Sequence, residues 1–353
     1  MIVHAVLPGD VHTVPSGGNV YDRRVLRGLR ELGIDVVEHL LPGAWPRGEA
    51  AAVANVLDDV PDAGSVLLDG LVACGVPDAL APHADRLRLV VLVHLPLADE
   101  HGLPAATARD LDARERAALG CATTVVTTSR WTADRVVASH GLDPARVLVA
   151  PPGVDPARAA RGSAVTGTPP RLLCLGALTP TKGQDVLIEA LARVADRSWT
   201  CVLAGPTTRD PGFVVRLRRA IAHHGLAERV TAPGTLTGRA LDAAWTATDL
   251  LVLPSRTETF GMVVTEALAR GIPVVASRVG GVSEAVGTTG PMPGIWVPTE
   301  NVGALAAALV RWLEDPVLRS GWKLSALGRR GTLMPWTSTC HRIAWTFRSP
   351  GPG

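Results

Sequence analysis

The strongest constraint on the fold is an alternation of short apolar runs with helix-like segments, which occurs in both halves of the chain. Runs in the first half predict strands at residues 2–7, 36–41, 65–68, 89–94, 124–128 and 146–150. Runs in the second half predict strands at residues 171–175, 200–204, 230–232, 249–253, 274–277 and 294–297. Helical patterns separate these runs, most clearly at residues 20–32, 131–140, 184–195, 211–223, 238–247, 261–270 and 302–314. Such an alternation is typical of doubly wound parallel α/β sheets.

Two α/β runs predict two domains, and 353 residues are enough for both. Turn-forming residues at 151–156 and a polar stretch rich in Gly, Thr and Pro at 161–170 separate the runs. We therefore expect a first domain over residues 1–160 and a second over residues 170–334. The end of the chain is rich in large aromatic side chains, which suit a docking segment because each buries much area.

Composition and charge exclude several classes of protein. The net charge of +2 is too small to indicate nucleic-acid binding or an anionic membrane. The five cysteines are scattered and form no Cys-x-x-Cys pair, so neither a zinc site nor a disulfide framework is expected. The N-terminal residues lack the basic start and cleavage site of a signal peptide, and no apolar run approaches the roughly 20 residues of a membrane span. These features indicate a cytoplasmic protein with reduced thiols.

Two carboxylates, Glu258 and Glu266, bracket the segment that points most directly to a ligand. Glu258 lies in a polar loop after an apolar run, Gly261 allows a tight turn, and Glu266 follows about one turn into a short helix that ends at Gly271. Open α/β sheets bind ligands where strands end and helices begin, and a helix N-terminus favours phosphate. Two carboxylates beside such a terminus suit a ligand that carries both hydroxyls and phosphates, which indicates a nucleotide sugar.

A second loop combines features of a phosphate site. Lys182 lies in a glycine-containing loop between an apolar run and a helix, an arrangement that can cradle phosphate. Lys182 and Lys323 are the only lysines in the chain, and arginine does not replace a compact ammonium group. A surface lysine at a helix start is the alternative, but a cation there opposes the helix dipole.

Three further positions follow strands of the first domain. Gly17 and Gly18 come after the first apolar run, where paired glycines let the backbone approach a ligand, although they also suit an ordinary turn. His94 ends the run 89–94, where it can be catalytic or a structural residue with satisfied hydrogen bonds. Asp99 and Glu100 follow it as acceptor contacts or as solvated loop carboxylates.

Pro-Ser before Glu258, the seven residues between Glu258 and Glu266, and Gly-Ile-Pro-Val-Val-Ala after the helix resemble the signature of retaining GT-B glycosyltransferases of family 4. The resemblance extends over most of the chain. It implies an α/β GT-B fold with two Rossmann-like doubly wound domains, an interdomain cleft, and a C-terminal tail at about 335–353 that crosses back to the first domain. The first domain would bind the acceptor and the second the donor.

The resemblance also assigns roles to residues. Glu258 would contact hydroxyls of the donor sugar, Glu266 would hold the ribose, and Lys182 would neutralise the departing nucleoside diphosphate. The catalytic residues would be Glu258, Lys182 and His94. The donor site would consist of Gly17, Gly18, Lys182, Glu258, Phe260, Gly261, Met262, Val263 and Glu266. Asp99 and Glu100 would face the acceptor.

The implied reaction moves a hexose-type sugar from a nucleoside-diphosphate sugar to an acceptor hydroxyl with retention of anomeric configuration. We expect neither a metal nor another cofactor, because Lys182 can supply the charge. Many family members have an arginine where Ala177 stands, so one cationic phosphate contact is missing here. The first domain has no obvious apolar docking helix, which favours a small-molecule or natural-product acceptor over a lipid. An epimerase, a hydrolase or a catalytically silent nucleotide-sugar-binding protein remain alternatives, and the oligomeric state stays open.

Overall fold

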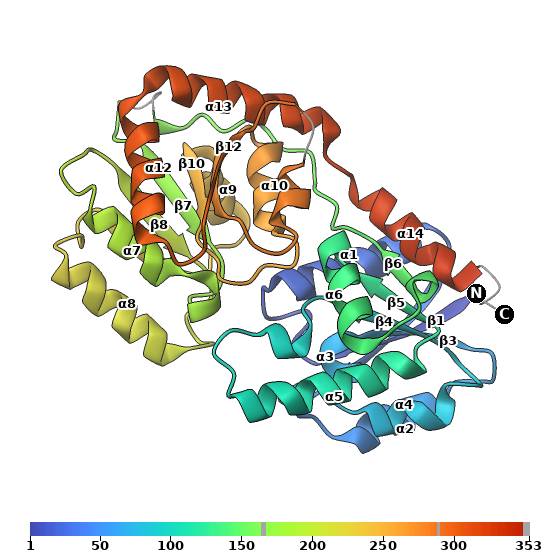
Figure 1. Cartoon of the computed structure of the whole chain (residues 1–353). Coiled ribbons are helices and arrows are strands. Elements are labelled where there is room, and N and C mark those ends of the chain that lie inside the picture. Colours follow the sequence, from blue (N-terminus) through green and yellow to red (C-terminus); the bar gives the residue numbers. More distant parts are fainter. Residues whose placement is uncertain (164–166, 288–289, 349–353) are drawn as a thin grey trace. The chain divides into compact units, whose positions relative to one another are not determined.

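The computed structural model describes residues 1–163, 167–287 and 290–348, which fold into two compact units (Figure 1). The first unit comprises Met1–Gly153 and the segment that begins at Met334, and the second comprises Val154–Leu333. The division therefore falls at Gly153, ahead of the polar stretch that we expected to separate the domains. The backbone N–H of Ala160 donates to the carbonyl of Arg270, and that of Ser163 donates to the Asp249 carboxylate, which ties this stretch to the second unit. Residues 164–166 and 349–353 lie outside the described residues.

The first unit contains a six-stranded parallel sheet in the order β2-β1-β3-β4-β5-β6. Its strands are β1 (Ile2–Pro8), β2 (Asp35–Leu41), β3 (Ser65–Asp69), β4 (Arg88–Val93), β5 (Thr124–Thr127) and β6 (Val147–Val149). The helices are α1 (Gly17–Glu31), α2 (Ala50–Asp58), α3 (Gly70–Ala73), α4 (Pro77–Leu80), α5 (Ala105–Cys121), α6 (Arg130–His140) and α14 (Trp336–Arg348).

The second unit contains a six-stranded parallel sheet in the order β12-β11-β10-β7-β8-β9. Its strands are β7 (Arg171–Leu175), β8 (Thr200–Ala204), β9 (Val230–Gly234), β10 (Leu250–Leu253), β11 (Val274–Ser277) and β12 (Gly294–Val297). The helices are α7 (Gln184–Ala192), α8 (Pro211–His223), α9 (Gly238–Thr246), α10 (Met262–Ala269), α11 (Val282–Val286), α12 (Val302–Glu314) and α13 (Pro316–Arg329).

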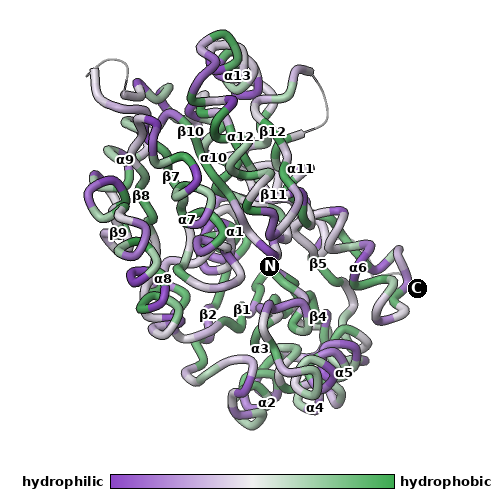
Figure 2. Tube along the Cα trace, turned by 60° about the vertical axis from the view of Figure 1, so that its left-hand side comes forward, coloured by the Kyte–Doolittle hydropathy of each residue, from purple (hydrophilic) through white to green (hydrophobic). Residues whose placement is uncertain are grey.

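The central strands, such as β3, β4, β10 and β11, are apolar and buried almost throughout because both faces of each sheet are covered, whereas the edge strands β2 and β9 carry exposed polar residues. Side chains alternate between the faces: in β4, Leu89 and Val91 join one buried cluster, whereas Val90 and Leu92 join another. The tube in Figure 2 is accordingly green along β4 and β10. Each predicted strand is present to within one or two residues, and the doubly wound α/β class is confirmed.

The C-terminal helix α14 belongs to the first unit, as the tail prediction requires. It packs beside α1, and its residues Ile343, Ala344 and Phe347 complete the cluster on that face of the sheet. Thr339 donates a hydrogen bond to the carbonyl of Pro151, and Arg88 of β4 donates to the carbonyl of Thr346. No helix in the described ranges combines the length and apolar character that a membrane span needs.

The strand order determines where ligands can bind. In each sheet the chain reverses direction beside the first strand of the unit, between β1 and β3 in the first and between β7 and β10 in the second. Loops leave the two neighbouring strands in opposite directions at such a switch point, which opens a crevice at their carboxyl ends. Gly17 and Gly18 follow β1, Lys182 follows β7 and Glu258 follows β10, whereas His94 follows β4, the strand next to β3.

Candidate functional site

The switch point of the second unit brings Lys182 and Glu258 together. Lys182 ends a 3-10 turn (Pro180–Lys182) that follows β7, and Glu258 lies in the loop that follows β10. Lys182 Nζ lies 2.6 Å from Glu258 Oε2, and the Ser255 hydroxyl donates to the same oxygen at 3.3 Å. The Lys182 side chain is 29% exposed and that of Glu258 is 13% exposed, so the pair lies at the protein surface but is shielded on one side.

The loop that carries Glu258 leads into α10 as the sequence predicts. Gly261 has a φ of +88°, a left-handed conformation that glycine adopts without strain, and α10 begins at the next residue. Glu266 is the fifth residue of this helix and is partly exposed. Phe260 is buried in the core, whereas Met262 and Val263 are partly buried beside it. Any contact of Phe260 with a ligand at this turn therefore uses its backbone.

Ala177 lies in the same loop as Lys182, at the position where the family often has an arginine. Its carbonyl oxygen accepts a hydrogen bond of 2.9 Å from Nε2 of Gln184, the first residue of α7. Gln184 is fully buried, and its Oε1 has no hydrogen-bond partner among the described residues. The buried Gln184 side chain thus holds the loop at Ala177 by a hydrogen bond from the protein interior.

The switch point of the first unit surrounds His94, which directly follows β4. Its Nε2 lies 2.8 Å from Oδ1 of Asp22 in α1 and 3.6 Å from Oδ2 of Asp69 at the end of β3. Tyr21 packs edge-on against the ring, with centroids 5.3 Å apart. A Cβ on Gly18 would lie 3.2 Å from Cδ2 of the ring, so a side chain at Gly18 would press on His94.

Charge within this cluster favours a protonated imidazole. Burial lowers the pKa of His94, but the Asp22 charge and hydrogen bond, aided by Asp69, outweigh it and raise the pKa to about 9. Burial and the neighbouring Asp22 charge raise the pKa of Asp69. The shifts of His94 and Asp69 both favour a bound proton within this buried cluster.

The same three residues could also hold a metal ion. Asp22, Asp69 and His94 each offer one ligand atom, and these atoms lie within 4.8 Å of one another. Within the described ranges, no other group of three His, Cys, Asp or Glu side chains brings its ligand atoms this close together. Oδ1 of Asp69 accepts the backbone N–H of Leu71 at 2.6 Å, and Nε2 of His94 lies 2.8 Å from Oδ1 of Asp22, whereas the buried Oδ2 of Asp22 has no hydrogen-bond partner among the described residues.

Gly17 and Gly18 lie in a helix and not in the loop that the sequence indicated. Helix α1 begins at Gly17, three residues earlier than predicted, because Ser16 caps it: the Ser16 hydroxyl accepts the backbone N–H of Asn19 at 3.1 Å. The two glycines therefore form the first turn of α1, beside His94.

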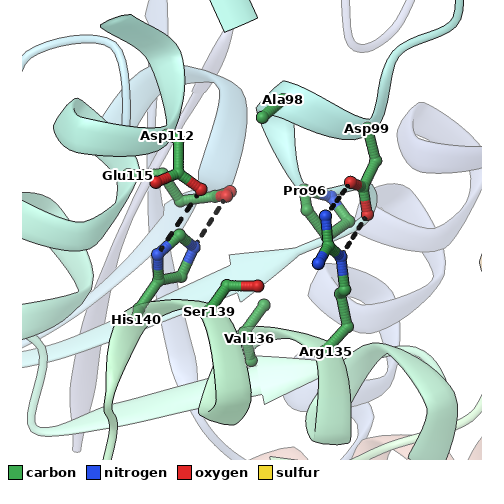
Figure 3. Close-up of a pocket in the computed structure, with 9 residues that line it drawn as sticks. All are labelled: Pro96, Ala98, Asp99, Asp112, Glu115, Arg135, Val136, Ser139 and His140. Atoms are coloured by element: carbon green, nitrogen blue, oxygen red, sulfur yellow. Dashed lines mark hydrogen bonds and ion pairs between the residues drawn. The ribbon is translucent and has the colours of Figure 1, made fainter. Parts of the chain in front are cut away.

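Asp99 is held in an ion pair. Its carboxylate accepts from Nε and Nη2 of Arg135 in α6 at 3.0 and 2.6 Å, as Figure 3 shows. The same region contains a buried pair, His140 and Glu115, with Nε2 and Oε2 3.1 Å apart. Glu100 is exposed. The sequence did not single out Arg135, His140 and Glu115, because each lies in a helix that contains several other charged residues.

Family models match most of the chain. A model described as glycosyl transferases group 1 matches residues 157–327, and one described as glycosyltransferase family 4 matches residues 69–158.

Curated relatives carry names of glycosyltransferases. The GDP-mannose-dependent alpha-(1-6)-phosphatidylinositol monomannoside mannosyltransferase of Mycolicibacterium smegmatis is 31% identical over 91% of this chain and 84% of its own length. The D-inositol 3-phosphate glycosyltransferase of Kineococcus radiotolerans is 33% identical over 61% of this chain. The chain spans only 57% of the length of that relative.

Solved structures show the same architecture. Sucrose-phosphate synthase from Thermosynechococcus elongatus superposes with a TM-score of 0.81 at 19% identity, over 99% of this chain and 98% of that protein. HepE of Anabaena in complex with UDP-glucose gives a TM-score of 0.76 at 20% identity, over 99% of this chain and all of that one. At these identities the likeness concerns the fold.

Proposed function

Because the chain belongs to the glycosyl transferases group 1 family and has its GT-B fold, we propose that it transfers a sugar from a nucleoside-diphosphate sugar to an acceptor hydroxyl. The observation that carries the proposal is the contact between Lys182 and Glu258 at the switch point of the second unit. One cation for phosphate and one carboxylate for hydroxyls, 2.6 Å apart, match the point where the diphosphate of such a donor meets its sugar.

Each residue of this site has a role in the proposed reaction. Lys182 and the N-terminus of α10 stabilise the diphosphate as negative charge develops on it. Glu258 binds sugar hydroxyls, and Glu266, one turn into α10, holds the ribose. The bond between the anomeric carbon and the phosphate oxygen breaks as the acceptor oxygen bonds to that carbon from the same face, which retains the configuration. The departing phosphate takes the acceptor proton, so no separate base and no resident metal is required.

The first unit would supply the acceptor side of the reaction. We propose that His94, as an imidazolium, donates a hydrogen bond to the sugar or acceptor, and that Gly17 and Gly18 leave space for the donor phosphates. The named relatives act on inositol phosphate or on a phosphatidylinositol mannoside, according to their names. We therefore propose that the acceptor is a polyol, either a free small molecule or the headgroup of a lipid.

A binding screen followed by a transfer assay tests this function. Nucleoside diphosphates and their sugars should raise the melting temperature of the protein, since ligands that bind only the native state stabilise it. The stabilising donor, offered with free inositol phosphate or with vesicles that contain phosphatidylinositol, should give a glycosylated product in one of the two mixtures. NMR of the product then reads the anomeric configuration.

The competing function is donor binding without transfer, which the missing arginine at Ala177 would favour. Such a protein would show the thermal shift but release free sugar, form an epimer or leave the donor intact with every acceptor. Absence of any shift with all nucleotides would contradict both functions.

A further inference from the structure

Arg256 joins the two loops that carry Lys182 and Glu258. It lies two residues before Glu258, and its guanidinium reaches back to the loop of Lys182. Nη1 donates to the Pro180 carbonyl at 2.5 Å and to Oδ1 of Asp185 at 2.9 Å, and Nη2 donates to Oδ2 of Asp185 at 2.8 Å. Asp185 stands in the first turn of α7. The Arg256 side chain therefore contacts the chain both at the start of the 3-10 turn, at Pro180, and after its end, at Asp185.

The backbones of the two loops also meet. The backbone N–H of Arg256 donates to the Thr181 carbonyl at 2.8 Å. Gly183, with a φ of +67°, approaches Pro254 so closely that a Cβ would clash with its carbonyl oxygen. On the other side, the Glu258 carbonyl accepts the backbone N–H of Gly281 at 3.1 Å. The loops are thus docked in one arrangement, and Arg256 supplies the charged contacts of that dock.

The guanidinium has few donors left for a ligand. Its Nε donates to Oε1 of Glu300 at 2.8 Å, and the side chain is 11% exposed. Hydrogen bonding to Asp185, against the opposing effect of burial, raises the pKa of Arg256 further above its ordinary range. A planar guanidinium that pairs at two points with one carboxylate fixes orientation as well as distance.

We propose that Arg256 is a positioning residue of the donor site, which sets the distance between Lys182 and Glu258 through the docked loops. This inference rests on the proposed function of that pair. Its consequence is that phosphate and sugar contacts are aligned before a donor arrives. Positioning of this kind affects the rate strongly, because a displacement of about 1 Å at a reacting centre can cost on the order of a hundredfold.

The two lysines of the chain make a test that does not require turnover. With lysine labelled at Nζ, the protein gives two ammonium signals, one from Lys182 and one from Lys323. In Arg256→Gln, the Lys182 signal should move toward that of a free lysine, in the direction that Glu258→Gln moves it, while the Lys323 signal stays in place. An unmoved Lys182 signal in a folded Arg256→Gln protein would overturn the inference.

Kinetics separate positioning from general destabilisation. Arg256→Gln should lower kcat/KM roughly ten- to a hundredfold. Arg256→Lys, which keeps the charge but not the planar group, should lower it by a smaller factor. Asp185→Asn should lower it as much as Arg256→Gln does, although the arginine charge is still present. Arg197→Gln is the matched control, since Arg197 also bridges two carboxylates, Asp196 and Glu314, away from the loops. Circular dichroism and the melting temperature establish that each variant is folded.

A double variant completes the test. In the Lys182→Ala background, Arg256→Gln should weaken nucleoside-diphosphate binding no further, because a positioning residue acts through Lys182. Fully additive losses would show that Arg256 contacts the ligand directly and would contradict the inference. A wild-type protein that binds no nucleotide would reject the proposed function, and the lysine signals would still decide whether Arg256 holds the pair.

Discussion

Lys182 and Glu258 neutralise each other across 2.6 Å, although one is assigned to phosphate and the other to sugar hydroxyls. A nucleoside diphosphate that enters this site must share Lys182 with a carboxylate of its own sign. A nucleotide sugar meets less opposition, because its sugar hydroxyls can donate to Glu258. If the proposed roles hold, we therefore expect the pair to favour the intact donor over the spent diphosphate, which would assist product release.

Replacement of Glu258 by Gln tests this competition. The variant should bind free nucleoside diphosphate more tightly, by up to about fivefold, since a partly exposed ion pair contributes roughly 0.2–1 kcal/mol. Sugar transfer should nevertheless fall by about a hundredfold or more, because the carboxylate that contacts the sugar is lost. Calorimetric titration and initial rates measure the two effects. Unchanged or weaker diphosphate binding would show that Glu258 does not compete for Lys182, and Glu189→Gln serves as a surface control.

Lys182→Ala should act in the opposite sense on binding. Loss of the ammonium removes a charge-assisted contact of about 1.5–3 kcal/mol and leaves Glu258 facing the phosphates, so diphosphate affinity should fall at least tenfold. Lys182→Arg should recover little, because a guanidinium does not fit the site of a compact ammonium. Lys323→Ala is the matched control on the exposed surface of α13. Equal affinity of Lys182→Ala and wild type for every nucleoside diphosphate would remove Lys182 from the site.

The fold and one part of the site were predictable from the sequence because the information is local. Apolar runs of strand length mark β4 and β10 directly, and the turn at Gly261 follows from the need for a left-handed residue before α10. Helix α5 was missed because its buried residues are few, Leu111, Glu115, Ala118 and Leu119, and leave no continuous apolar stripe.

The partners of His94 were not predicted from the sequence, because they come from distant parts of the chain: Asp22 lies 72 positions away. Lys182 and Glu258 are 76 positions apart, and only the family resemblance placed them in one site. Asp69 had a signal that could have been read, since it is a carboxylate at the end of a buried strand beside β4. Arg256 had none, because its partners depend on how two loops dock.

The docked C-terminal helix provides a test of the fold with a built-in control. Phe347 is 5% exposed within the core of the first unit, whereas Trp345, two residues earlier on the same helix, is 63% exposed. Phe347→Ala should lower the free energy of unfolding by about 3–5 kcal/mol, and Trp345→Ala should change it by less than about 0.5 kcal/mol. Urea unfolding followed by circular dichroism measures both. Equal losses from the two substitutions would contradict the placement of α14.

The cluster around His94 gives stability a defined dependence on pH. A group whose pKa is raised on folding stabilises the protein below its unfolded value, and that contribution disappears as the pH rises through the folded value. For His94 the window runs from 6.5 to about 9, and the raised pKa of Asp69 acts with the same sign. The free energy of unfolding should therefore fall as the pH rises from 6.5 to 9.

Asp22→Asn should remove most of that fall, because the Asp22 carboxylate is the main group that raises the pKa of His94 against burial. The imidazole of the variant should titrate at or below its ordinary value, which NMR of labelled histidines measures, with His94→Gln identifying the signal among ten histidines. If an imidazolium at His94 takes part in transfer, the alkaline limb of the pH–rate profile should move to lower pH by the same amount. A His94 pKa that stays near 9 in Asp22→Asn would mean that Asp69 alone maintains the charge, and Asp69→Asn would then have to lower it.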